Sequence, residues 1–161
     1  MGSKIYHVLN GDSLANEFPS KLLPGEIVVM REALIDGDLG GKNLEEFWKI
    51  RAAYLENLPE SEGKKYFNLV VPEMKKIIRA SPSAEFNLWF EYDLFCQINL
   101  WFILSLLRKR QAYGDIFIVY PDYTNESEKW KGFGWFKEGD LVRSYQKRVK
   151  LEDKDLQLAD A

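Results

Sequence analysis

The sequence IYHVLNGDS, residues 5–13, decides the fold class of this chain. Its first five residues are almost continuously apolar, which is typical of a strand covered on both faces of a parallel sheet. The polar residues 10–13 then mark the end of that strand. The same pattern, an apolar run followed by polar or turn residues, recurs at residues 27–30, 86–90 and 116–120. The sequence therefore predicts four buried strands.

Helical spacing of apolar residues fills the segments between these strands. Asn43 and Glu46 form a capping-box pattern, and the spacing after them predicts a helix over residues 44–58, with Arg51 as the polar exception on its apolar face. Residues 94–107 are apolar on nearly all sides, and they end in basic residues that suit a helix C-terminus. We expect a buried core helix there, because the run is shorter than the roughly 20 residues that span a bilayer.

The segment 64–79 is amphipathic but contains Pro72, which has no backbone N–H to donate. A kink or a restart of the helix is expected at this proline. The basic residues within 143–150 alternate with apolar ones and are interpreted as a solvated helix face rather than a nucleic-acid patch.

Strands that alternate with helices predict an α/β fold. The expected architecture is a three-layer, doubly wound, mostly parallel sheet of about four strands in the flavodoxin- or Rossmann-like order 2-1-3-4, with a helical insertion after the second strand and a helical C-terminal tail. Residues 1–125 are expected to form the α/β domain. Residues 126–161 are expected to form an aromatic–glycine turn and a helical tail that packs on that domain or leads out of it.

The tail continues a helical spacing to the last residues, at Leu151, Leu156, Leu158 and Ala159. This pattern leaves open a further C-terminal segment of a longer protein as a partner.

Composition narrows the classes of protein. The chain has 161 residues, 46% of them hydrophobic and 29% charged, which excludes disordered and collagen-like chains. Its formal net charge of −3 argues against nucleic acid and anionic membranes as partners. The single cysteine excludes an internal disulfide and, with no signal-peptide pattern, indicates a cytoplasmic protein. Dinucleotide, P-loop and zinc motifs are absent from the sequence.

Three segments together resemble one bacterial family. Residues 7–15, 31–34 and 89–97 are similar to the family catalogued as domain of unknown function 1835, and the similarity runs from about residue 4 to the C-terminus. Tyr92 stands where many relatives carry histidine, so this chain departs from the family pattern at that position. The resemblance implies the same fold class as the periodicity and implies no particular activity.

Carboxylates follow each of three predicted strands. Asp12, Glu32, Glu91 and Asp93 all fall at strand ends that a doubly wound sheet brings to one edge. Carboxylate oxygens are suitable ligands for Mg²⁺, which makes Asp12, Glu91 and Asp93 candidate metal ligands. Arg31 is a candidate for binding phosphate, or for a structural ion pair with Glu32 or Glu91. The candidate ligand-binding residues for a small phosphorylated molecule are His7, Gly11, Asp12, Ser13, Arg31, Glu32 and Gln97.

The motif Gly11-Asp12-Ser13-Leu14 resembles the first block of the lipase and esterase family named for these four residues. There the serine is the nucleophile and requires a histidine base. The only histidine here, His7, precedes the motif on the entering strand. We therefore favour capping of the following helix by Asp12 or Ser13, with anion binding by the helix N–H groups as the alternative.

Cys96 lies in the first turn of the core helix, which Asp93 is expected to cap. A helix N-terminus favours a thiolate, and His7 could assist it, but the apolar neighbours favour a buried and slowly reacting thiol. Gln97 is expected to make either a core hydrogen bond or a ligand contact. Trp130 and Trp135, with Phe136, either cover the crevice or, as we favour, pack against the sheet edge.

Two function classes follow. The first is a small phosphorylated-ligand or divalent-metal binding domain, with phosphoryl transfer or hydrolysis as candidate activities. The second is a non-catalytic interaction module or the N-terminal domain of a longer protein. Carboxylates that face one open pocket would favour the first class, and carboxylates satisfied by N–H groups and Arg31 would favour the second.

Overall fold

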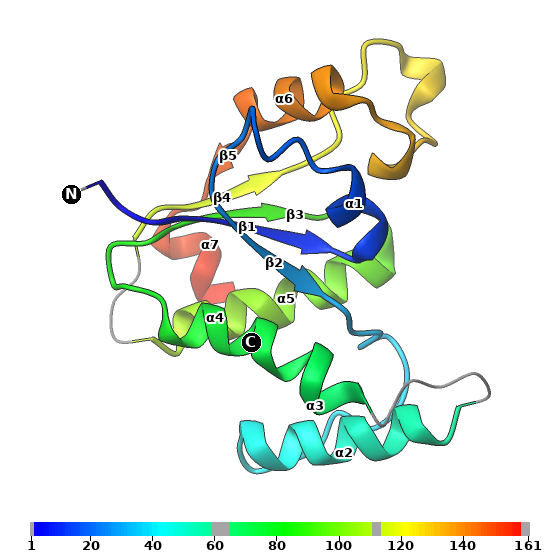
Figure 1. Ribbon diagram of the computed structural model, residues 1–161, viewed down its shortest axis with the longest axis vertical. Helices are drawn as coiled ribbons and strands as arrows, with labels where there is room; N and C mark the ends of the chain where they lie inside the picture. Colours follow the sequence, from blue (N-terminus) through cyan, green and yellow to red (C-terminus); the bar gives the residue numbers. More distant parts are fainter. Residues whose placement is uncertain (1, 59–64, 111–113, 159–161) are drawn as a thin grey trace.

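The protein is an α/β structure built on one five-stranded sheet. The computed structural model describes residues 2–58, 65–110 and 114–158 (Figure 1). The strands are β1 (Ile5–Asn10), β2 (Glu26–Met30), β3 (Glu85–Trp89), β4 (Ile116–Val119) and β5 (Val149–Lys150), in the order β2-β1-β3-β4-β5. The first four strands run parallel to one another, and their order confirms the predicted 2-1-3-4.

The fifth strand was not predicted. β5 pairs antiparallel with β4, with Ile118 opposite Val149 and Phe117 opposite Lys150. The interpretation of residues 143–150 as a helix face is therefore wrong beyond Gln146, where α6 (Glu138–Gln146) ends and a turn leads into β5. A strand of two residues is too short to show an alternating pattern, so its pairing with β4 is what defines it.

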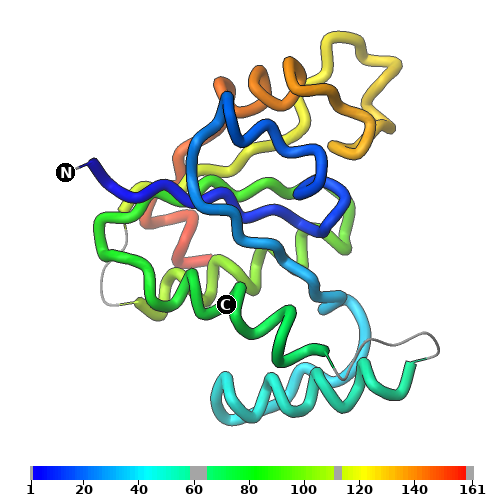
Figure 2. Tube along the Cα trace, viewed as in Figure 1, coloured from blue at the N-terminus to red at the C-terminus, as the bar shows by residue number. Residues whose placement is uncertain are grey.

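Helices cover both faces of the sheet, as expected for a three-layer fold (Figure 2). One face carries α1 (Asp12–Glu17), the short 3₁₀ turn η3 (Phe133–Trp135) and α6 (Glu138–Gln146). The other carries α4 (Val71–Arg79), α5 (Leu94–Arg108) and α7 (Asp153–Gln157), with α2 (Leu44–Glu56) and α3 (Tyr66–Leu69) beyond them. A further 3₁₀ turn, η2 (Glu126–Glu128), lies in the connection after β4.

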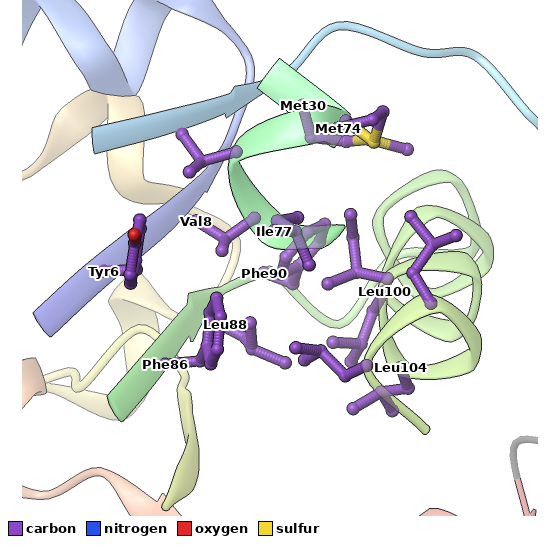
Figure 3. Close-up of a cluster of buried hydrophobic side chains, with 14 of the residues drawn as sticks. Tyr6, Val8, Met30, Met74, Ile77, Phe86, Leu88, Phe90, Leu100 and Leu104 are labelled. Atoms are coloured by element: carbon purple, nitrogen blue, oxygen red, sulfur yellow. The ribbon is translucent and has the colours of Figure 1, made fainter. Parts of the chain in front are cut away.

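The two faces have separate cores because neighbouring side chains of a strand point to opposite sides. Tyr6 and Val8 of β1 belong to the larger core beneath α4 and α5, where Phe86 and Leu88 of β3 join them (Figure 3). Leu9 belongs to the smaller core, beneath α1, η3 and α6. Alternate residues of a strand therefore contact the helices on opposite faces of the sheet.

The helix boundaries agree with the sequence pattern. α2 begins after Asn43, whose side chain accepts the N–H of Glu46, and ends at Glu56. α3 ends at Leu69 and α4 restarts at Val71, with Pro72 in its first turn, so the predicted restart is confirmed. Lys64, the expected start of this segment, lies outside the described residues.

α5 is only partly the buried helix that was expected. Cys96, Ile103 and Leu107 are among its buried residues, but Leu94 and Trp101 are exposed. The helix covers only one face of the sheet, so the prediction of burial on all sides is wrong. No helix among the described residues is long and apolar enough to cross a membrane.

The outer edge of β2 is covered by side chains of α4. The N–H of Val29 donates to Glu73 Oε2 (2.8 Å), and Lys76 Nζ donates to the carbonyl oxygen of Ile27 (3.0 Å). Glu73 and Lys76 also pair with each other. They satisfy backbone groups that an exposed edge strand would offer to another chain.

The tail packs on the same body. β5 extends the sheet, Leu141 of α6 is fully buried in the smaller core, and Leu156 of α7 is buried in the larger one. Leu158 is exposed, and Ala159 lies outside the described residues. Of the two arrangements expected for residues 126–161, the described part therefore adopts packing on the α/β domain.

Candidate functional site: the crevice above strands β1 and β3

A cavity of about 330 Å³ opens at the carboxyl ends of β1 and β3. The strand order reverses between these two strands, which pair directly, and ligands of doubly wound folds bind at such positions. Ser13 and Glu91 both line the cavity, so the predicted juxtaposition of residues 11–13 with residues 91–93 is confirmed. The full lining is Asn10, Ser13, Leu14, Trp89, Glu91, Cys96, Gly132, Phe133, Gly134 and Trp135.

The turn after β1 depends on Gly11. Its φ of 104° lies in the region that only glycine adopts without strain, and it is the N-cap residue of α1. No side chain caps this helix, so the predicted capping by Asp12 or Ser13 is wrong. The Asp12 carboxylate instead binds Arg31.

Arg31 is held by Asp12 and by backbone. Its Nε lies 2.9 Å from both Asp12 oxygens, its Nη2 lies 2.8 Å from Asp12 Oδ1, and its Nη1 donates to the carbonyl of Leu69 at 3.0 Å. The bond with Asp12 raises the pKa of the guanidinium. The predicted ion pairs of Arg31 with Glu32 or Glu91 are therefore wrong. Neither Arg31 nor Asp12 lines the cavity.

Glu32 is buried away from the crevice in a network of its own. Arg51 donates to it through Nε and Nη2, the latter at 2.9 Å, and Tyr66 Oη donates at 2.5 Å. Burial, and then the charge of Glu32, raise the pKa of Tyr66. The sequence did signal Arg51 as a charged exception on an apolar helix face, but nothing in it linked Arg51 or Tyr66 to Glu32. Glu32 is a structural residue and not part of the crevice.

Asp93 caps α5 as predicted. Its Oδ1 accepts the N–H of Cys96 at 3.0 Å. Partial burial acts to raise the pKa of Asp93, but hydrogen bonds from Cys96 and from the first turn of α5 outweigh it and lower the pKa. The carboxylate is satisfied by the helix that it begins.

The expected Mg²⁺ site is not formed by these residues. Asp12 is neutralised by Arg31, Asp93 accepts helix N–H groups, and Glu91 binds the N–H of Phe133. Within the described ranges, no group of three or more His, Cys, Asp or Glu side chains is placed to hold a metal ion. The strand ends meet at one edge, as expected, but the carboxylates point to different partners.

Among the described residues that line the cavity, Glu91 is the one with a charged side chain. Its Oε1 accepts the N–H of Phe133 at 2.8 Å, and a Cβ placed on Gly132 would lie only 2.2 Å from its Oε2. Burial raises the pKa of Glu91, the hydrogen bond from Phe133 opposes this, and the charge of Asp93 adds to it. Among the described residues no cation pairs with Glu91. It is a half-buried carboxylate that a single N–H stabilises.

Residues 132–135 form one wall of the crevice, and η3 lies beside α1 (Figure 2). Tyr123 donates a hydrogen bond to the carbonyl of Lys131, and Phe133 is buried in the smaller core. Phe136 packs against this core, as expected. Trp135 instead lines the cavity, and both Trp135 and Trp130 have exposed side chains. The preference for packing over covering is therefore wrong for Trp135.

Cys96 and His7 do not form a reactive pair. Asn10 Nδ2 donates to Cys96 Sγ at 3.0 Å, and burial, then Asp93, raise the pKa of the thiol to about 12. His7 lies on the opposite face of the sheet, where its Nδ1 accepts Trp89 Nε1 at 3.2 Å and its ring contacts Phe18. Burial lowers the pKa of His7 to about 4. It is a core histidine and does not serve Ser13 or Cys96.

Gln97 makes the core hydrogen bond that was one of its two expected roles, because its Nε2 donates to the carbonyl of Glu91 at 2.7 Å. Asn10 and Asn99 were missed by the sequence analysis. Asn99 donates to Asn10 Oδ1 and to the carbonyl of Glu32, so it joins the crevice to the loop after β2. An asparagine on an apolar helix was the available signal.

Comparisons of the chain with protein-family models, with curated proteins and with solved structures found no match. The family resemblance described above stays a prediction.

Proposed function

We propose that this protein binds a small molecule that carries a positively charged amino group, in the crevice above β1 and β3. The observation that carries the proposal is Glu91, a half-buried carboxylate on the cavity wall without a cationic partner among the described residues. A buried charge is stabilised when an opposite charge and further hydrogen bonds reach it. A ligand ammonium group would supply both.

The aromatic side chains around Glu91 support the same ligand. Trp135 lines the cavity with an exposed indole, and Phe133 forms part of the same wall. The face of an indole ring attracts cations within about 6 Å. Asn10 already donates to Cys96 and accepts from Asn99, so the Ser13 hydroxyl is the further polar group that a ligand can reach.

The lining does not favour the phosphorylated ligand expected from the sequence. Its described residues include no lysine, arginine or histidine, and Arg31 is paired with Asp12 outside it. A phosphate would meet the Glu91 carboxylate with no compensating cation. The geometry supports binding, and no nucleophile–base pair among the described residues supports catalysis at this site.

Benzylamine tests the proposal, with benzyl alcohol and benzyl phosphate as neutral and anionic analogues of the same size class. We expect benzylamine to raise the melting temperature and to change the tryptophan fluorescence at millimolar concentration, and the analogues to do neither. Glu91→Gln should abolish both responses, whereas Glu45→Gln, which removes a carboxylate on α2, should keep them. A response to benzyl phosphate instead of benzylamine would reject the proposal, as would an undiminished response of Glu91→Gln.

A non-catalytic interaction module is the second candidate. Large apolar side chains stay exposed around the same edge, namely those of Tyr92, Leu94, Phe95, Trp130 and Trp135. Clustered exposed apolar groups are typical of contact surfaces between proteins. Light scattering of the wild type and of Trp130→Ser/Trp135→Ser separates the candidates, because concentration-dependent association that these substitutions remove would support a contact surface.

A further inference from the structure

A second cavity, of about 340 Å³, lies between α2 and α5, away from the crevice. The loop after β2, the first turns of α2 and one face of α5 enclose it, at residues 39–44, Phe47 and the stripe from Ile98 to Lys109. Figure 1 shows this loop leading from the end of β2 down to α2. None of its lining residues is shared with the crevice.

The walls of this cavity are apolar. Phe47 of α2 and Phe102 of α5 stack with their ring centroids 5.1 Å apart. Ile98 precedes Phe102 by one helical turn on the same side of α5, and Leu34 and Leu44 complete the apolar wall. A cavity with these walls accepts a hydrocarbon chain.

Gly41 fixes the loop at the mouth of the cavity. Its φ is 122°, and a Cβ there would lie 2.7 Å from the backbone nitrogen of Phe47. The chain therefore approaches α2 more closely than any other residue type would allow.

The polar groups of the lining are internally satisfied, apart from two lysines. Asn43 Oδ1 accepts the N–H of Glu46, and Ser105 Oγ donates to the carbonyl of Phe102. Two carboxylates outside the lining accept backbone N–H groups of lining residues: Glu46 accepts that of Lys42 and Asp38 accepts that of Gly40. The charged side chains of the lining are Lys42 and Lys109, and no acidic side chain among the described residues joins them there.

We propose that this cavity binds a small amphiphile with one hydrocarbon chain and one carboxylate, the chain against the stacked rings of Phe47 and Phe102 and the carboxylate at Lys42 and Lys109. Charge complementarity argues for the anionic head, because the charged side chains among the described lining residues are both cations. The volume argues for a small molecule rather than a protein segment, because it lies within the range of small-molecule sites.

Isothermal titration with decanoate, below its micellar concentration, tests the proposal. We expect saturable binding, with decanol weaker and decylamine weaker still. Affinity should rise from hexanoate to decanoate by about fourfold for each added CH₂. Lys42→Met/Lys109→Met keeps most of the side-chain length and removes both charges, and it should weaken decanoate binding by about tenfold. Lys21→Met, a lysine outside the cavity, is the matched control and should change nothing.

Ser105→Phe places a ring in the cavity and should abolish binding of both decanoate and decanol. If this variant does not fold, the lysine pair and the chain-length series still decide the question. Equal affinity for decanoate and decylamine would overturn the proposal, as would an absence of decanoate binding. Full binding by a folded Ser105→Phe variant would also overturn it, because the ligand would then lie on the open surface, as an acidic peptide would.

Discussion

Two glutamates that follow β2 and β3, the strands on either side of β1, have opposite roles in this protein. Glu32 is buried, and its carboxylate is fully satisfied by Arg51, Tyr66 and a backbone N–H. Glu91 keeps one N–H bond and faces a cavity. A buried carboxylate with every partner in place supports the fold, whereas one with a single neutral donor costs stability and is available to a ligand.

This difference predicts the effect of Glu91→Gln on stability. The amide oxygen can still accept the Phe133 N–H, while the charge is removed. Because the folded-state pKa of Glu91 is raised above its ordinary value of 4.5, the wild type gains stability as pH falls through that pKa and loses it as pH rises. We expect the variant to have the higher free energy of unfolding at pH 7, and the difference to shrink toward pH 4.

Urea unfolding at pH 4 and pH 7 measures this difference. Glu45→Gln is the control, because Glu45 is exposed and paired with Lys49 on the surface of α2. A Glu91→Gln variant less stable than the wild type at pH 7 would show that the carboxylate is structural, as Glu32 is.

Among the elements, β5 and α7 stabilise the fold in a way that the sequence pattern did not predict. β5 covers the open edge of β4, and the N–H of Leu151 donates to the carbonyl of Ile116 at 2.8 Å. α7 then packs against α5 and inserts Leu156 into the larger core. The described part of the chain after α6 is thus held by an edge strand and a buried leucine, rather than by a long helix.

Two leucines of the tail test this account. Leu156 is 1% exposed and Leu158 is 62% exposed. Leu156→Ala leaves a cavity in the larger core and should lower the free energy of unfolding by about 2–5 kcal/mol. Leu158→Ala should change it by less than about 0.5 kcal/mol. Similar effects of the two substitutions in chemical denaturation would show that α7 does not dock on α5.

At the scale of the whole molecule, the smaller core makes stability depend on pH. His7 of β1 is fully buried beneath α6, where its ring contacts Tyr145. Burial lowers the pKa of His7 from 6.5 to about 4. In the unfolded chain, His7 is protonated below about pH 6.5, whereas in the folded protein it is protonated only below about pH 4. Folding stability should therefore fall as pH decreases through this window, by about 3 kcal/mol at pH 4.

The test compares the slope of unfolding free energy against pH in His7→Phe with that of the histidine-containing protein, both carrying Glu91→Gln. The second substitution removes the opposing contribution of Glu91. The pKa values of Asp93, Asp122 and Asp140 are lowered from 3.8, so these groups contribute chiefly near and below pH 4, and they contribute equally to both proteins. His7→Phe should flatten the slope between pH 6.5 and 4 whatever its effect at pH 7, and an unchanged slope would contradict the account.

The candidate site was predictable to the extent that it depends on local sequence. Asp93 caps α5 because an aspartate before an apolar helical run accepts the N–H groups of that helix, and Pro72 restarts α4 because it has no N–H. The partner of Glu91 was not predictable. Phe133 follows it by 42 residues, and no pattern in the sequence joins them.

The sequence by itself determined the α/β class, the parallel order of four strands and the edge at which their ends meet. Those features follow from apolar periodicity and from the handedness of crossovers, which are properties of short segments. The tertiary structure alone decided that Asp12 binds Arg31, that His7 lies beneath α6 and not in the crevice, and that Glu91 faces a cavity. Those outcomes depend on contacts between residues far apart in the sequence. Tertiary packing decides which of these residues come within hydrogen-bond distance of each charged group.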